Sequence, residues 1–250
     1  MKKIIVANWK LNPETLNDAI NNFKYLKKHI IGSRSIQTII APPTAFLYRL
    51  SQETKSQSLI FAVQDVSTDK NGELVGETSA PQAKSIGAKC ALLGHSASLK
   101  NDPENVRMKL AQSIKSGLVP ILFFGESDLD EKGKFLTSLR NDIRSTFKGI
   151  NPKFLKGIVV VYEPVWAVGK SAKNKIPPKH IHTMTLFIKK ILIEIIGSSA
   201  KKIPILYGGS VNPDNVEEIF SVPTVDGVVL GRASFNPKIF VRLFEIVKSL

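Results

Sequence analysis

Residues 158–163 read IVVVYE, an unbroken apolar run that ends directly in a glutamate. No polar residue alternates with the apolar ones, which is typical of a strand buried on both faces of a parallel sheet. Seven similar runs occur along the 250 residues, with starting points about 32 residues apart, the length of a strand, a helix and a return to the next parallel strand. The eight runs are Ile4–Ala7, Thr38–Ala41, Leu59–Val63, Cys90–Leu93, Pro120–Phe124, Ile158–Tyr162, Ile203–Tyr207 and Gly227–Leu230.

The segments between these runs carry helix signals. Apolar residues recur at helical spacing over Ile181–Ile196 and Phe235–Val247. Asn or Asp also stands directly before proline four times, which predicts a helix that begins at each proline after a capping side chain. The four pairs are Asn12-Pro13, Asp102-Pro103, Asn212-Pro213 and Asn236-Pro237.

Eight strands that alternate with helices favour a (β/α)8 barrel over an open sheet. In such a barrel eight parallel strands form the inner ring and the helices lie outside it. Periodicity alone does not prove that the sheet closes. We expect one domain of this kind over residues 1–250.

The composition is that of a globular protein with a strong positive charge. Hydrophobic residues make up 43% of the chain, enough for a buried core, and 35 Lys and Arg outnumber 21 Asp and Glu to give a net charge of +14. A charge of this size suits a nucleic-acid binder, or it attracts small anionic substrates to a cleft. The lysines are scattered singly and in pairs without interleaved aromatic residues, so the sequence does not favour nucleic acid as a partner.

Several features bear on where the protein works. Cys90 is the single cysteine, which excludes an intrachain disulfide and argues against a cysteine-based zinc site. No stretch approaches the ~18 continuous apolar residues of a membrane span. The apolar run behind Met1-Lys2-Lys3 ends at Asn8, too early for the apolar core of a signal peptide. We therefore expect a soluble, cytoplasmic protein with no membrane contact.

Polar residues and glycines directly follow most of the eight runs. They are Asn8 and Lys10, Gln64 and Asp65, Gly94-His95-Ser96, Gly125-Glu126, Glu163, Gly208-Gly209-Ser210 and Gly231-Arg232. In a barrel these positions share the rim at the carboxyl ends of the strands, where barrel enzymes hold their catalytic residues. The sequence therefore predicts an active site at this rim.

Three side chains of this rim suit proton transfer. Glu163 ends a strongly apolar strand, where burial can raise its pKa to that of a general base, although a loop glutamate often pairs with a lysine instead. His95 lies at a strand end between Gly94 and Ser96, where a histidine is either catalytic or merely hydrogen-bonded for structure. Lys10 and Asn8 point to the same rim because alternate strand residues share a face, although Lys10 could equally be a solvated lysine.

The two glycine turns, Gly208-Gly209-Ser210 and Gly231-Arg232, suit a phosphate group. Backbone amides in such turns bind phosphate without a metal, although turns also use glycine for geometry alone. No set of His, Asp or Glu has metal-ligand spacing, and no nucleotide-binding glycine motif occurs, so we expect neither a metal nor a cofactor. The combination indicates proton transfer on a small phosphorylated carbonyl compound.

Five strings surround these residues. They are Asn8-Trp9-Lys10, Leu93-Gly94-His95-Ser96, YEPVWAVG at 162–169, YGGSVNP at 207–213 and DGVVLGRAS at 226–234. In order and spacing, from the first strand to the last, they closely resemble the triosephosphate isomerase family, whose fold is the (β/α)8 TIM barrel. The strings YEPVWAVG and YGGSV are specific, whereas NWK and GHS are weaker when taken alone.

The resemblance implies an enzyme of glycolysis and gluconeogenesis that interconverts dihydroxyacetone phosphate and D-glyceraldehyde 3-phosphate through an enediolate. As described for this family, Glu163 would move the proton between carbons 1 and 2, and a neutral His95 would polarise the carbonyl group. Lys10 would stabilise negative charge, and Asn8 would help to orient the site.

The resemblance also implies a phosphate site and a lid. Backbone amides of four residues would hold the phosphate, namely Gly169, Ser210, Gly231 and Arg232. The lid would close over the substrate and exclude water, and its residues would be Trp166, Ala167, Val168, Lys170 and Ser171.

The sequence departs from the family at several places. After Gly94-His95-Ser96 the family continues Glu-Arg-Arg, and Ala97 here removes a carboxylate that the family places beside the lysine. Val75 replaces a threonine that reaches the neighbouring subunit in family dimers, and the segment after Ala97 is about three residues short. Phe123 stands where the family often has cysteine, and residues 169–171 read GKS instead of GTG.

These changes leave three functions open. The first is an active isomerase, a homodimer through the loops around Val75 and Ala97 with altered contacts. The second is another barrel enzyme that acts on a phosphosugar, which would lack the string at 162–169. The third is a repurposed or low-activity relative that binds a phosphate-bearing partner.

Overall fold

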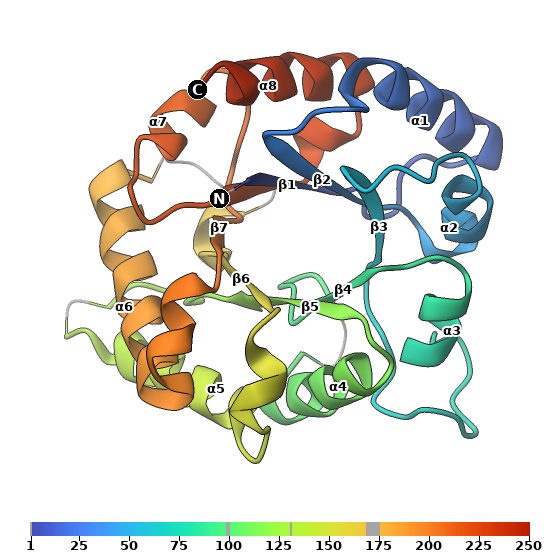
Figure 1. The fold of residues 1–250 in the computed structure, drawn as a ribbon. Helices are drawn as coiled ribbons and strands as arrows, with labels where there is room; N and C mark the ends of the chain where they lie inside the picture. The colour runs from blue at the N-terminus through green and yellow to red at the C-terminus, as the bar shows by residue number, and fades with distance from the viewer. Residues whose placement is uncertain (1, 99–100, 131, 169–175) are drawn as a thin grey trace.

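The structure is a computed structural model that describes residues 2–98, 101–130, 132–168 and 176–250. Eight parallel strands form a closed barrel in sequence order, with the last strand paired to the first (Figure 1). The strands are β1 Lys3–Asn8, β2 Ile36–Ala41, β3 Leu59–Val63, β4 Cys90–Leu93, β5 Val119–Phe124, β6 Val159–Tyr162, β7 Ile205–Tyr207 and β8 Gly227–Leu230. The predicted (β/α)8 barrel is therefore confirmed, and the predicted strands differ from these by at most two residues at either end.

The helices form an outer ring around the strands (Figure 1). They are α1 Leu16–Ile30, α2 Thr44–Ser51, α3 Ala80–Ser85, α4 Pro103–Lys115, α5 Lys134–Phe147, α6 Pro178–Ile196, α7 Val216–Phe220 and α8 Pro237–Ser249. The 3₁₀ turns among the described residues are η1 Pro152–Leu155, η2 Val165–Ala167, η3 Gly197–Lys202 and η4 Arg232–Ser234. None of the helices in the described part of the chain is long and apolar enough to cross a membrane.

The barrel closes where β8 lies beside β1. Ile4 is opposite Gly227 and Ala7 is opposite Leu230. A Cβ atom at Gly227 would lie 2.1 Å from the carbonyl oxygen of Ile4, so only glycine lets the two strands approach here.

Two apolar clusters fill the molecule. Alternate strand residues pack against the helices in the larger cluster, and the remaining strand residues fill the barrel interior. The interior cluster consists of Val6, Ile39, Ala41, Ala62, Cys90, Leu92, Ile121, Phe123, Val159, Val161, Leu206 and Val229. The barrel is thus a packed core, and the space for a ligand lies at its rim.

The proline pairs predicted two helix starts correctly. Asp102 caps α4 by accepting the Asn105 N–H at 3.1 Å, and Asn236 caps α8 by accepting the Lys238 N–H at 2.9 Å. Each of these helices begins at the proline that follows the capping residue. The capping side chain and the proline, which has no N–H, therefore occupy the predicted positions at the helix start.

The other two predicted helix starts are wrong. The helix α1 begins at Leu16, three residues beyond Pro13, because the Thr15 hydroxyl caps it by accepting the Asp18 N–H. The helix α7 begins at Val216 because Asn212 and Asn215 close a turn instead, in which Asn215 Oδ1 accepts the Asn212 N–H at 2.9 Å.

Candidate active site

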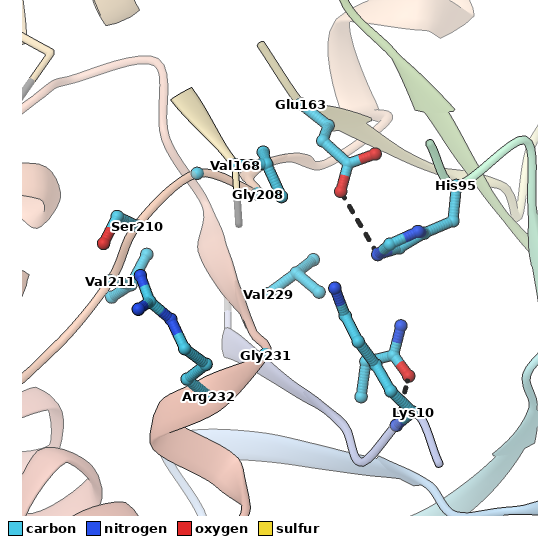
Figure 2. A pocket seen from close by; sticks show the side chains of 12 residues that line it. Lys10, His95, Glu163, Val168, Gly208, Ser210, Val211, Val229, Gly231 and Arg232 are labelled. Carbon is cyan, nitrogen blue, oxygen red and sulfur yellow. Dashed lines mark hydrogen bonds and ion pairs between the residues drawn. The ribbon is translucent and has the colours of Figure 1, made fainter. Parts of the chain in front are cut away.

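A pocket opens at the carboxyl ends of the strands, where the sequence places the polar rim. It is lined by Asn8, Lys10, His95, Glu163, Val168, Gly208, Gly209, Ser210, Val211, Val229, Gly231 and Arg232. Figure 2 shows Lys10, His95 and Glu163 converging at one end of the pocket and Ser210, Val211 and Arg232 at the other. The lining residues come from five strand ends, and the first and last of them are more than 220 positions apart in the sequence. The fold therefore brings them together around one small space.

Five residues predicted for the lid and the phosphate site lie elsewhere or cannot be placed. Gly169, Lys170 and Ser171 lie outside the described residues. Trp166 and Ala167 do not line the pocket. Both belong to η2, which follows Glu163, and Ala167 is buried.

Glu163 is held at the pocket by the close contact between β5 and β6. Its N–H donates to the Phe124 carbonyl oxygen at 2.8 Å. A Cβ atom at Gly125 would lie 1.8 Å from the Glu163 carbonyl oxygen, so glycine is required beside it. The carboxylate accepts the Ser96 N–H at 2.9 Å through Oε2, and its Oε1 lies 3.2 Å from His95 Nε2.

Burial controls the proton affinity of Glu163. The residue is only 3% exposed, and loss of hydration raises the pKa of its carboxyl group to about 7. The hydrogen bonds from Ser96 and the positive charge of Lys10 oppose this rise. A carboxylate with a pKa near neutrality is well matched to the work of a general base.

His95 is neutral and in a defined tautomer. The Ala97 N–H donates to Nδ1 at 3.0 Å, so Nδ1 must be an acceptor and Nε2 carries the proton that points to Glu163. Burial, followed by the positive charge of Lys10, lowers the pKa of the imidazole to about 4. The Phe123 ring packs against it with centroids 5.1 Å apart and adds to this burial. The contact with Glu163 is therefore a hydrogen bond from a neutral imidazole.

Lys10 adopts a left-handed backbone conformation with φ of 52°, which is uncommon for a residue with a side chain. Two side chains hold it there. Asn8 Oδ1 accepts the Lys10 N–H at 3.1 Å, and Gln64 Nε2 donates to the Lys10 carbonyl oxygen at 2.7 Å. Asn8 and Gln64 thus fix the backbone from which the Lys10 ammonium group reaches the pocket (Figure 2).

The other end of the pocket consists of two turns fixed by side chains. A Cβ atom at Gly209 would lie 2.1 Å from Tyr207 Oη, so the first turn requires glycine there. Asn215 Nδ2 donates to the Ser210 carbonyl oxygen at 2.8 Å. In the second turn the Ser234 hydroxyl bonds to the Gly231 carbonyl oxygen at 2.6 Å.

Two carboxylates at the rim have partners other than Lys10. Asp65 pairs at 2.7 Å with Lys109, a buried lysine of α4. Glu126 accepts hydrogen bonds from Tyr162 and Trp166. Among the described residues neither of them therefore replaces the carboxylate that Ala97 removes beside Lys10.

Sequence reasoning missed several residues that shape the site. Asn215 and Lys109 lie in helical regions away from the strand ends, and His180 is the third residue of α6. Gln64 follows a strand and so was visible as a rim residue, but its hydrogen bond to Lys10 carries no local signal. No group of three or more His, Cys, Asp or Glu is placed to hold a metal ion in the described part of the chain.

Comparison with known proteins decides the family. The family model described as triosephosphate isomerase matches residues 3–247. The chain belongs to the triosephosphate isomerase family. It is 33% identical to the triosephosphate isomerase of Buchnera aphidicola subsp. Schizaphis graminum, over 99% of this chain and 98% of that protein.

Two further members of the triosephosphate isomerase family extend the comparison. The triosephosphate isomerase of Protochlamydia amoebophila is 32% identical, over 96% of this chain and 91% of that protein. The crystal structure of triosephosphate isomerase from Bartonella henselae superposes with a TM-score of 0.86 and 25% identity, over 99% of this chain and all of that one.

Proposed function

We propose that the protein is a triose-phosphate isomerase, an aldose-ketose isomerase that interconverts dihydroxyacetone phosphate and D-glyceraldehyde 3-phosphate. Family membership over nearly the whole chain supports this reaction. The observation that carries it is the pairing of Glu163, with a pKa of about 7, and a neutral His95 whose Nε2 lies 3.2 Å away. A base and a neutral donor side by side are what the transfer of a carbon-bound proton requires.

In the proposed reaction Glu163 removes a proton from carbon 1 of dihydroxyacetone phosphate. The electron pair of that C–H bond forms a carbon–carbon double bond, and the carbonyl oxygen takes up negative charge as an enediolate. His95 Nε2–H and the Lys10 ammonium group stabilise this charge, because both lie at the end of the pocket where Glu163 meets the substrate (Figure 2). His95 then donates its Nε2 proton to the oxygen on carbon 2 and takes up the hydroxyl proton of carbon 1, while Glu163 returns the carbon-bound proton to carbon 2. The carbonyl group now lies on carbon 1, and the Glu163 carboxylate and the neutral imidazole are restored.

The phosphate is proposed to lie at the opposite end of the pocket. Backbone amides of Ser210, Gly231 and Arg232 would bind it, with Gly169 as a fourth residue that lies outside the described part. The support is the pair of glycine turns at strand ends, fixed by Asn215 and Ser234. The segment from Trp166 to Ser171 is proposed as the lid.

We further propose a homodimer that forms through the loops around Val75 and Ala97. Val75 is 96% exposed, and Leu11, the residue after Lys10, is 89% exposed. Exposed apolar side chains that lie together mark surfaces that another chain covers, and these loops are proposed to form such a surface. With valine and alanine in place of threonine and glutamate, this interface would be less polar than in other family members.

The proposal includes a single domain over residues 1–250 and a cytoplasmic location in glycolysis and gluconeogenesis. The pairing of β1 with β8 ties the two ends of the chain into one sheet. The buried thiol of Cys90, the single cysteine, is compatible with a reducing compartment.

A coupled assay with purified protein tests the reaction. We expect the wild-type protein to isomerise glyceraldehyde 3-phosphate, and Glu163→Ala to lower kcat by about 10³-fold because the general base is lost. A matched variant, Glu217→Ala on α7, changes a carboxylate away from the pocket and should retain activity. Wild-type protein without isomerase activity, or activity indifferent to Glu163, would refute the proposal.

A further inference from the structure

A buried polar cluster lies beside the pocket but does not line it. It consists of Glu126 after β5, Tyr162 at the end of β6, Trp166 in η2 and His180 near the start of α6. We call these four residues the Glu126 cluster. The Glu126 side chain is only 1% exposed, and the His180 side chain is 28% exposed.

Glu126 holds the chain on both sides of Glu163. Its Oε1 accepts the Tyr162 hydroxyl and the Trp166 indole N–H, each at 2.8 Å. Its backbone carbonyl oxygen accepts the Val165 N–H at 3.0 Å. Tyr162 directly precedes Glu163 and Trp166 follows it by three residues, so one carboxylate fixes both flanks of the proposed base.

His180 completes the cluster through the Tyr162 hydroxyl. Its Nε2 lies 3.1 Å from Tyr162 Oη and 3.8 Å from Glu126 Oε1. A carboxylate only accepts hydrogen bonds, so the Tyr162 proton points to Glu126, and Tyr162 Oη must accept from His180. The resulting chain of donors runs from His180 Nε2–H to Tyr162 and on to Glu126.

The hydrogen bonds that run from His180 through Tyr162 to Glu126 are important for orienting Glu126, because its carboxylate has few other partners. Its second oxygen, Oε2, is buried and has no hydrogen-bond partner among the described residues. No lysine or arginine of the described residues lies within ion-pair distance of it, which leaves His180 as the nearest group able to carry a positive charge. An incompletely satisfied buried carboxylate depends strongly on the donors that remain.

The rings of the cluster also pack together. The Trp166 and His180 rings meet edge to face with centroids 6.0 Å apart, and the Tyr162 and His180 centroids are 6.4 Å apart. Burial and the nearby Glu126 charge raise the pKa of the Tyr162 hydroxyl, so it keeps its proton as a donor. His180 therefore contacts both residues that flank Glu163.

We propose that His180 is a positioning residue for Glu163, which acts by donating a hydrogen bond to Tyr162 and thereby orienting the Glu126 carboxylate that anchors Tyr162 and Trp166. This role rests on the proposed function, since it places the base of that reaction. His180 does not touch the pocket, so substrate binding does not depend on it directly.

Two substitutions of His180 test this role. His180→Leu removes the donor, whereas His180→Gln keeps an N–H for Tyr162. His182→Leu is the matched control, because His182 lies on the same helix and bonds to Thr224 outside the cluster. The side-chain indole N–H signals of uniformly ¹⁵N-labelled protein report the contact, since Trp9 and Trp166 are the two tryptophans and Trp9 provides the internal reference.

With His180→Leu we expect kcat to fall about tenfold with KM within about twofold, because small displacements of a catalytic group cost up to ~100-fold in rate. The Trp166 indole signal should shift while that of Trp9 stays. Glutamine at position 180 should restore both the rate and the signal, and His182→Leu should change neither.

The inference is overturned if His180→Leu keeps the wild-type kcat and Trp166 signal, or if it matches His182→Leu in both. The wild-type protein gives an independent test that needs no variant. The ¹⁵N shifts of the His180 imidazole at pH 8 should show a protonated Nε2, and an unprotonated Nε2 contradicts the donor chain. Absence of isomerase activity in the wild-type protein would refute the proposed function instead. The two failures can be distinguished because the Trp166 signal, which reports the role of His180, is measured separately from turnover.

Discussion

Replacing Glu163 by glutamine should stabilise the folded protein at pH 8 much more than at pH 5. In the unfolded chain this carboxyl group ionises near pH 4.5, whereas burial raises its pKa to about 7 in the folded state. Between these values the folded state binds more protons, so the contribution of Glu163 to stability is complete below pH 4.5 and is lost as pH rises through 7. Each pKa unit corresponds to about 1.36 kcal/mol, which makes the loss about 3 kcal/mol.

The contribution of His95 to folding stability changes with pH in the opposite direction. Its pKa falls from 6.5 in the unfolded chain to about 4 in the folded state, so between these values the unfolded state binds more protons. Its contribution to stability therefore rises with pH from 4 to 6.5, by a similar amount of about 3 kcal/mol. In the wild-type protein the pH-dependent contributions of Glu163 and His95 to the free energy of unfolding largely cancel. The Glu163→Gln variant retains only the contribution of His95.

Urea denaturation of both proteins at several pH values measures this difference, provided that the unfolding is reversible and two-state. Other titrating groups are shared, so they cancel when the two proteins are compared. The stability of the variant relative to wild type should increase by about 3 kcal/mol between pH 4.5 and pH 8. A difference that is the same at both pH values would show that Glu163 ionises with an ordinary pKa in the folded state.

Three further predictions concern catalysis and assembly. In the wild-type protein kcat/KM should rise with pH to a plateau, with an apparent pKa of about 7 from Glu163 and no step from His95 above pH 5, as measured by a pH–rate profile. Lys10→Met should lower kcat/KM by about 10²-fold through loss of charge stabilisation and should move the same profile to a higher pKa, since the Lys10 charge lowers that of Glu163. Val75→Asp should lower the solution mass measured by light scattering from dimer to monomer, whereas Val75→Thr should leave it unchanged.

Each of these predictions has a contradicting outcome. A pH–rate profile, calculated for the substrate dianion, whose acid limb has a slope of two instead of one above pH 5 would mean that His95 titrates alongside Glu163 and is not held neutral. A Lys10→Met profile with an unchanged pKa would mean that the ammonium group does not act on Glu163. A wild-type mass of one chain, or a dimer that tolerates Val75→Asp, would mean that this loop does not form the interface.

The strands and the rim could be predicted because their signals are local. A strand buried on both faces shows as a continuous apolar run, and β3, β4 and β8 match the runs without any correction. Residues that directly follow such strands must lie at one end of the barrel, which brings Glu163 and His95 to the same pocket. The strands also lie in the barrel in the same order as the apolar runs occur along the chain.

Other features depend on contacts between distant segments and leave no local signal. The position of His180 in α6 says nothing about Tyr162, because their contact requires the helix to pack beside β6. The neutral state of His95 depends on the Ala97 N–H and on burial against Phe123, which the sequence shows only as neighbours in a string. Side-chain caps also compete, which is why Thr15 rather than Pro13 sets the start of α1.

In the proposed reaction a single base, Glu163, carries the substrate proton between two carbons. Isomerisation of D-glyceraldehyde 3-phosphate in D₂O, followed by ¹H NMR of the dihydroxyacetone phosphate formed, measures this transfer. A proton held by a carboxyl group is carried to the product unless it first exchanges with the solvent. We therefore predict that part of the wild-type product retains hydrogen at carbon 1 and part contains deuterium, and that Glu163→Gln forms product about 10³-fold more slowly at the same protein concentration. Product from the wild-type protein that is fully deuterated at carbon 1, or product formed equally fast by the variant, would mean that Glu163 does not carry the substrate proton.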